Sequence, residues 1–151
     1  MAQSLTKIYI HLIFHIKTTS PNIIEKDLPR VHTYINELIN VCGCTALKVG
    51  GTENHIHTVF LLSKDEPLSH VVEEIKRKSS RWIKNIDPWY KDFAWQSGYG
   101  AFSVSQSTVD KTIAYIEKQR EHHKKRTFKE EYEEFLKLYE VEYNEEYFIR
   151  D

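Results

Sequence analysis

The sequence lacks any long run of apolar residues. Its longest candidate, residues 8–16, carries His11 and His15 and is shorter than the roughly 20 residues of a membrane-spanning helix. This segment also lacks the small-residue cleavage site of a secretory signal peptide. We therefore expect a cytoplasmic protein with no membrane partner.

Cysteine is also scarce. Cys42 and Cys44 are the only two cysteines and stand one residue apart, which excludes a disulfide framework. Without a second cysteine pair they make a poor zinc site. We expect both to pack at the end of a helix.

The chain has almost no net charge, but its charges are unevenly distributed. The formal net charge is −1, yet residues 1–126 hold 18 Lys and Arg against 13 Asp and Glu, and residues 127–151 hold 3 against 9. A basic body with an acidic C-terminal helix and tail is compatible with a polyanion bound on one face. At 151 residues and 40% hydrophobic content, we expect one globular domain over residues 1–151.

What the sequence does contain is a clear order of strand and helix patterns. Apolar residues alternate over residues 7–17, which predicts a strand with one buried face. Residues 27–42 have helical spacing and Gly43 ends the pattern. Residues 45–49 and 55–62 predict a hairpin, with a longer loop that begins at a Gly-Gly pair.

The second half continues this order. Pro67 precedes another amphipathic helix, and residues 93–105 predict one or two strands broken at glycines. Ser107 is the expected N-cap of a helix to about residue 125, and Thr127 begins a last helix. The fold class is therefore α+β, a ferredoxin-like βαββαβ antiparallel sheet with helices on one face plus C-terminal helices.

Two short patterns are candidates for chemistry. Residues two apart on a strand share a face, so His55 and His57 would place two imidazoles side by side. Tyr115 and Gln119 lie four apart on the expected helix and share one of its faces. Strand histidines are more often half-buried or solvated, and a tyrosine more often packs, so the patterns alone leave the question open.

Taken in order, these features resemble the HUH single-tyrosine transposases of small bacterial insertion sequences, the transposase IS200-like family. The resemblance covers nearly the whole chain, including the segments IYIHLIFHIK, IKRKSSRWI, WQSGYGAFSVS and YIEKQREHH. It implies a DNA transposase that cleaves and rejoins single-stranded DNA at the ends of its element.

The resemblance also implies roles for the site residues. Tyr115 would attack a DNA phosphodiester and leave a 5′-phosphotyrosine link and a free 3′-hydroxyl. His55, His57 and Gln119 would hold Mg²⁺ or Mn²⁺, although imidazole ligands by themselves equally permit Zn²⁺ or Ni²⁺. Because a phenol with a pKa of about 10 is a poor nucleophile at neutral pH, a cation that polarises the phosphate suits this chemistry.

Two positions depart from the pattern of many relatives. Asn54 stands where an aspartate often precedes the first histidine, and Thr58 stands where an aliphatic residue is common. Asparagine accepts a hydrogen bond but lacks the charge that would raise the basicity of a histidine. The departure therefore bears on metal affinity more than on the existence of the site.

Several basic residues are candidates for DNA contacts. They lie on the expected helix after Pro67 and in the charged run near residue 122: Lys76, Arg77, Lys78, Arg81, Lys84, His122 and Lys124. Such runs are usually solvated helix faces, and this interpretation stays open. In a transposase they would contact the DNA backbone.

The family also implies partners. These are single-stranded DNA with hairpin ends and a second copy of the chain, in a homodimer whose tyrosine helices can complete the histidine pairs in trans. His11 and His15 are too far apart on one strand to chelate one ion, so we expect them to be structural. Two alternatives remain, a domesticated hairpin-binding protein without catalysis and an unrelated metal-dependent hydrolase.

Overall fold

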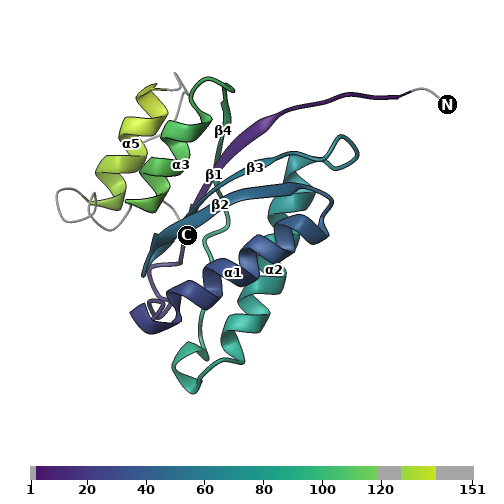
Figure 1. Cartoon of the computed structure of the whole chain (residues 1–151). Helices are drawn as coiled ribbons and strands as arrows, with labels where there is room; N and C mark the ends of the chain where they lie inside the picture. Colours follow the sequence, from purple (N-terminus) through teal and green to yellow (C-terminus); the bar gives the residue numbers. More distant parts are fainter. Residues whose placement is uncertain (1–2, 119–126, 139–151) are drawn as a thin grey trace.

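A computed structural model of the chain describes residues 3–118 and 127–138 (Figure 1). One antiparallel sheet has the strand order β2-β3-β1-β4. The strands are β1 (Tyr9–His15), β2 (Thr45–Thr52), β3 (His55–Leu61) and β4 (Gly100–Val104). The helices are η1 (Glu25–Asp27), α1 (Leu28–Val41), α2 (Leu68–Lys84), η2 (Pro88–Tyr90), α3 (Val109–Glu117) and α5 (Phe128–Leu138). This is the predicted ferredoxin-like order.

Helices α1 and α2 cover one face of the sheet (Figure 1). The main core lies in this layer, where Leu12 and Phe14 of β1 pack with Ile35 of α1 and Ile75 of α2. Cys44 is also buried in this core, as its expected packing role requires. The apolar stripe of each helix thus explains why the sequence predicted both helices.

Helices α3 and α5 cover the opposite face of the sheet (Figure 1). The prediction that β1 has one buried face is therefore wrong, because all seven of its residues are buried. Tyr9 packs with Ile116 of α3, and Ile13 packs with Tyr132 of α5. The alternation in β1 separates two buried layers, one of them lined by aromatic residues and histidines.

The β2–β3 hairpin is tighter than predicted. Gly50 and Gly51 belong to β2, and residues 53–54 form the turn. A Cβ atom at position 50 would lie 2.6 Å from Cγ2 of Ile116, so this glycine lets α3 approach the strand. Gly51 has φ of 138°, a conformation that L side chains rarely adopt. The two glycines serve close packing and a backbone twist, where the sequence had indicated a loop.

The predicted bounds of the last two helices have different outcomes. Helix α3 begins at Val109 and ends at Glu117, so the prediction of one helix from Ser107 to about residue 125 is wrong. The hydroxyls of Ser105, Ser107 and Thr108 bond to one another, and no side chain caps α3. For α5 the prediction is confirmed, because Thr127 Oγ1 accepts a hydrogen bond from the Glu130 backbone N–H at 3.2 Å.

None of the helices in the described part of the chain has the length and apolar character that a membrane span requires.

Candidate metal centre and nucleophile

Both histidines of the His-x-His pair point from β3 into the layer covered by α3 and α5. His55 and His57 are fully buried, and their ring centroids lie 5.1 Å apart. The shared face follows from the two-residue period of the strand. The two imidazoles therefore lie side by side as expected, but neither is accessible to solvent.

His11 of β1 lies beside this pair. Its Nε2 atom is 3.0 Å from Nδ1 of His57, across neighbouring antiparallel strands. Burial, followed by the nearby His57, holds the pKa of His11 well below its usual value. His11 is thus a neutral imidazole at neutral pH, whose Nε2 can accept a hydrogen bond from Nδ1–H of His57 and so leave Nε2 of His57 as the nitrogen that could bind a metal ion.

Short polar side chains hold His55 in the same way. Its Nδ1 atom lies 2.8 Å from Oδ1 of Asn54 and 3.0 Å from Oγ1 of Thr52. Asn54 therefore accepts a hydrogen bond, as expected, and supplies no charge. With Nδ1 engaged, Nε2 is the nitrogen that His55 would offer to a metal ion.

Helix α3 brings Tyr115 to the histidine pair. The Tyr115 ring centroid lies 5.9 Å from that of His57 and 5.4 Å from that of Phe135, and the phenolic oxygen is buried. Ile116, the next residue along the helix, packs over Gly50 and sets how closely α3 approaches the sheet. The structure thus places a tyrosine and two histidines, 58 residues apart in sequence at their closest, in one buried cluster.

The sequence interpretation missed Glu131. Its Oε1 atom lies 2.7 Å from Nε2 of His57, and the Glu131 side chain is 1% exposed. Ligand atoms of His55, His57 and Glu131 all lie within 4.8 Å of one another, so they form a group that can hold a metal ion. A signal was available, because Glu131 interrupts the apolar stripe of α5 formed by Phe128, Tyr132, Phe135 and Leu136.

Other predicted site residues fall elsewhere. Gln119, His122 and Lys124 lie outside the described residues. The basic residues of α2 belong to the opposite layer of the sheet from the histidines (Figure 1). The structure therefore separates the candidate DNA-contact residues of α2 from the candidate metal centre.

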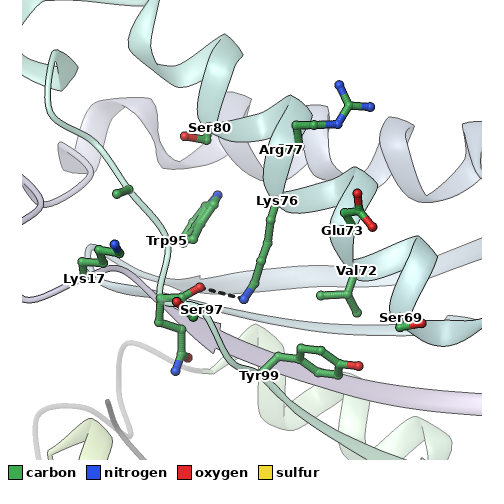
Figure 2. A pocket seen from close by; sticks show the side chains of 12 residues that line it. Lys17, Ser69, Val72, Glu73, Lys76, Arg77, Ser80, Trp95, Ser97 and Tyr99 are labelled. Carbon is green, nitrogen blue, oxygen red and sulfur yellow. Dashed lines mark hydrogen bonds between the residues drawn. The ribbon is translucent and has the colours of Figure 1, made fainter. Parts of the chain in front are cut away.

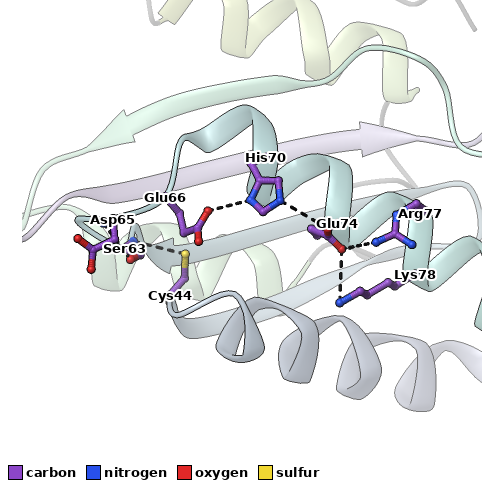
Figure 3. Close-up of polar contacts among 8 residues, drawn as sticks. All are labelled: Cys44, Ser63, Asp65, Glu66, His70, Glu74, Arg77 and Lys78. Carbon is purple, nitrogen blue, oxygen red and sulfur yellow. Dashed lines mark hydrogen bonds and ion pairs between the residues drawn. The ribbon is translucent and has the colours of Figure 1, made fainter.

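The cations of α2 have different environments. Arg77 and Lys78 both contact Glu74 of the same helix, with N–O distances of 2.6 and 3.4 Å (Figure 3). Arg81 and Lys84, further along, are exposed. Arg81 is therefore a freer candidate for a DNA contact than Arg77 or Lys78.

Lys76 points from α2 toward the segment before β4. Its Nζ atom donates to the carbonyl oxygens of Gln96 and Gly98 at 2.9 and 2.6 Å, and burial lowers the pKa of Lys76 to about 8. It lines a groove of about 520 Å³ (Figure 2), together with Lys17, Arg77, Trp95 and Tyr99 among others. Lys76 is therefore a structural bridge between α2 and this segment.

Comparisons with known proteins agree with this architecture. Residues 4–119 match the family model described as "Transposase IS200 like". A crystal structure of a candidate transposase from Deinococcus radiodurans R1 has a TM-score of 0.60 and 17% identity, covering 79% of this chain and 98% of that chain. A REP-associated tyrosine transposase bound to a REP hairpin has a TM-score of 0.59 and 13% identity, covering 82% of this chain and 73% of that chain. No curated protein matches the sequence.

Proposed function

Because this chain belongs to the transposase IS200-like family, we propose that it cleaves and rejoins single-stranded DNA through a covalent tyrosine–DNA link. The observation that carries the proposal is the position of Tyr115, whose ring lies 5.9 Å from that of His57 in the buried histidine cluster. A phenol held beside a candidate cation site is the arrangement that nucleophilic attack on a phosphodiester requires.

The reaction assigned to Tyr115 balances without an external energy source. The phenolic oxygen forms a bond to phosphorus, the bond from phosphorus to the 3′-oxygen breaks, and the phenol proton is lost. The 3′-oxygen takes up a proton and leaves as a 3′-hydroxyl, while the 5′-phosphate stays on Tyr115. Attack by another 3′-hydroxyl reverses these steps and joins the strands.

The donor set fits a divalent cation. His55 and His57 would hold Mg²⁺ or Mn²⁺, with their Nδ1 atoms already engaged by Asn54 and His11. When bound, such an ion polarises the scissile phosphate and stabilises the leaving oxygen. Gln119 stays a predicted ligand, since it lies outside the described residues. A hard carboxylate oxygen from Glu131 favours Mg²⁺ or Mn²⁺ over softer alternatives.

We further propose that the DNA carries a hairpin, as in the neighbour that is bound to a REP hairpin. The exposed cations of α2, Arg81 and Lys84, would contact the DNA backbone on the face away from the histidines. Binding of the hairpin and cleavage would then use different faces of the sheet.

We also propose a homodimer formed by the single domain over residues 1–151. Within one chain, Tyr115 already faces that chain's own His57. A mixed dimer of His55→Ala and Tyr115→Phe chains distinguishes the two arrangements. Exchange of the tyrosine helix leaves one intact composite site and therefore activity, whereas sites formed within each chain leave none.

The deciding experiment uses single-stranded DNA from the regions that flank the coding sequence, labelled at its 3′-end. The protein should attach to the downstream fragment, so a denaturing gel should show a labelled protein–DNA species that requires Mg²⁺ or Mn²⁺. Tyr115→Phe should abolish this species. Hairpin binding without an adduct or cleavage would indicate a DNA-binding protein, and cleavage that survives in Tyr115→Phe but not in His57→Ala would indicate a hydrolase.

A further inference from the structure

The histidine pair is closed to DNA in this structure. His55, His57 and Glu131 are at most 1% exposed, and the phenolic oxygen of Tyr115 is also buried. The rings of Phe128 and Phe135 of α5 lie over the site, 4.6 Å from His55 and 6.0 Å from His57 between centroids. A phosphate cannot reach the histidines while α5 occupies this position.

A buried carboxylate requires a compensating charge. An ionised carboxylate with 1% exposure is strongly disfavoured unless a cation or hydrogen-bond donors face it. Among the groups that face this carboxylate, Nε2 of His57 lies 2.7 Å from Oε1 of Glu131. The Nε2 atom that makes this contact is also the nitrogen that His57 would offer to a metal ion.

The positions of the three groups suit a single ion. Their ligand atoms lie within 4.8 Å of one another, and a bond of about 2.1 Å from each atom to a common Mg²⁺ requires only small adjustments. We propose that Glu131 is a ligand of the metal ion in a closed resting state, where its carboxylate occupies the place that a DNA phosphate oxygen takes during cleavage. This proposal rests on the function proposed above and deepens it.

The exchange follows from the chemistry of the two groups. A carboxylate and a phosphodiester both present an anionic oxygen to the same cation. Helix α5 and DNA would therefore exclude each other at this site. Helix α5 is thus a cover that DNA must displace. Glu131 would keep the ion bound and protected from solvent when no DNA is present.

The packing of α5 offers a second way to test the cover. Tyr132 packs against Gly100 of β4, where a Cβ atom would lie 2.6 Å from the tyrosine hydroxyl and 2.9 Å from Cε2. Gly100→Ala therefore displaces α5 without removing any of the three ligands. At saturating Mn²⁺, where weaker metal binding no longer limits the reaction, this variant tests the cover while the Glu131 side chain is retained.

The first measurement is Mn²⁺ affinity by isothermal titration calorimetry without DNA. We expect Glu131→Gln to weaken binding at least tenfold, and Gly100→Ala to weaken it because α5 no longer holds Glu131 at the histidines. Glu134→Gln, an exposed glutamate of the same helix, is the matched control and should bind as the wild type does. Equal affinities in Glu131→Gln and the wild type, with both folded by circular dichroism, would overturn the ligand role.

The second measurement is the initial rate of the Tyr115 adduct at subsaturating DNA and saturating Mn²⁺. We expect Gly100→Ala to react several-fold faster, because the cover opens more easily. A rate for Gly100→Ala equal to or below that of the wild type would overturn the proposal that DNA must displace α5. If the wild type forms the adduct but Glu131→Gln binds Mn²⁺ as tightly as the wild type, the ligand role of Glu131 is wrong and the proposed function stands. If Mn²⁺ binding depends on Glu131 but the wild type forms no adduct, the proposed function is wrong.

Discussion

The Nε2 atom of His57 lies 2.7 Å from Oε1 of Glu131, although 74 residues separate them in the sequence. Both side chains are almost fully buried, so their contact ties the C-terminal helix to the central sheet. Breaking a buried pair by removing one partner is costly, because the other partner is left without compensation.

We therefore expect Glu131→Ala to lower the free energy of unfolding by about 3 kcal/mol. Glu131→Gln should cost less, since its amide group can still form a hydrogen bond with Nε2 of His57. Urea unfolding measures both, with Glu134→Ala as the exposed control. A free energy of unfolding for Glu131→Ala equal to that of the wild type would show that the pair contributes nothing to stability.

Gly50 controls the approach of α3 to the sheet. A methyl group there would lie 2.6 Å from Cγ2 of Ile116, so we expect Gly50→Ala to lower stability by about 1–3 kcal/mol. The adduct rate should fall as well, because Tyr115 precedes Ile116 on the displaced helix. Ile116→Ala removes Cγ2, so it should cost less of both properties in the Gly50→Ala chain than it costs in the wild type. Equal costs in the two backgrounds would indicate that the effect of Gly50→Ala does not come from the contact with the Ile116 side chain.

His32 of α1 makes stability depend on pH. Burial, aided by nearby Lys48, lowers the pKa of His32 to about 4, whereas an unfolded histidine titrates at about 6.5. The unfolded state therefore binds more protons between these values, so the stabilisation is present above pH 6.5 and is lost as pH falls toward 4.

The check is the urea midpoint of the wild type and of His32→Gln at several pH values between 7.5 and 4.5. The variant should lose less stability over this range. The urea midpoint of the variant should still rise with pH, because the lowered pKa of His11 acts in the same direction. Parallel curves for the two proteins would rule out His32 as a source of the dependence.

Arg81 tests whether α2 binds DNA. Because this residue is exposed on the face away from the histidines, Arg81→Ala should weaken hairpin binding for all sequences and reduce the salt slope by about one. The adduct rate at saturating DNA should not change. Arg77→Ala should have a smaller effect, since Glu74 already pairs with Arg77. Unchanged affinity and salt slope for Arg81→Ala would show that its side chain is only solvated.

Local patterns predicted much of the fold. The alternation in β1, the helical stripe of α1 and the Thr127–Glu130 cap of α5 depend on residues close in sequence, and the structure has the predicted strand, helix and cap. The pattern was misleading at Gly50 and Gly51, because a glycine needed for close packing resembles one needed for a turn. It also failed at Ser107, where hydroxyls bond to one another instead of to the helix.

The sequence by itself determined the order of elements, the family and the face that His55 and His57 share, because these follow from periodicity and from residues at fixed spacing. Only the tertiary structure decided that β1 is buried on both faces and that His11 and Glu131 flank His57 from 46 and 74 residues away. Those contacts arise when strands pair and when α5 docks on the sheet. No local spacing specifies them, because they depend on which surfaces pack together.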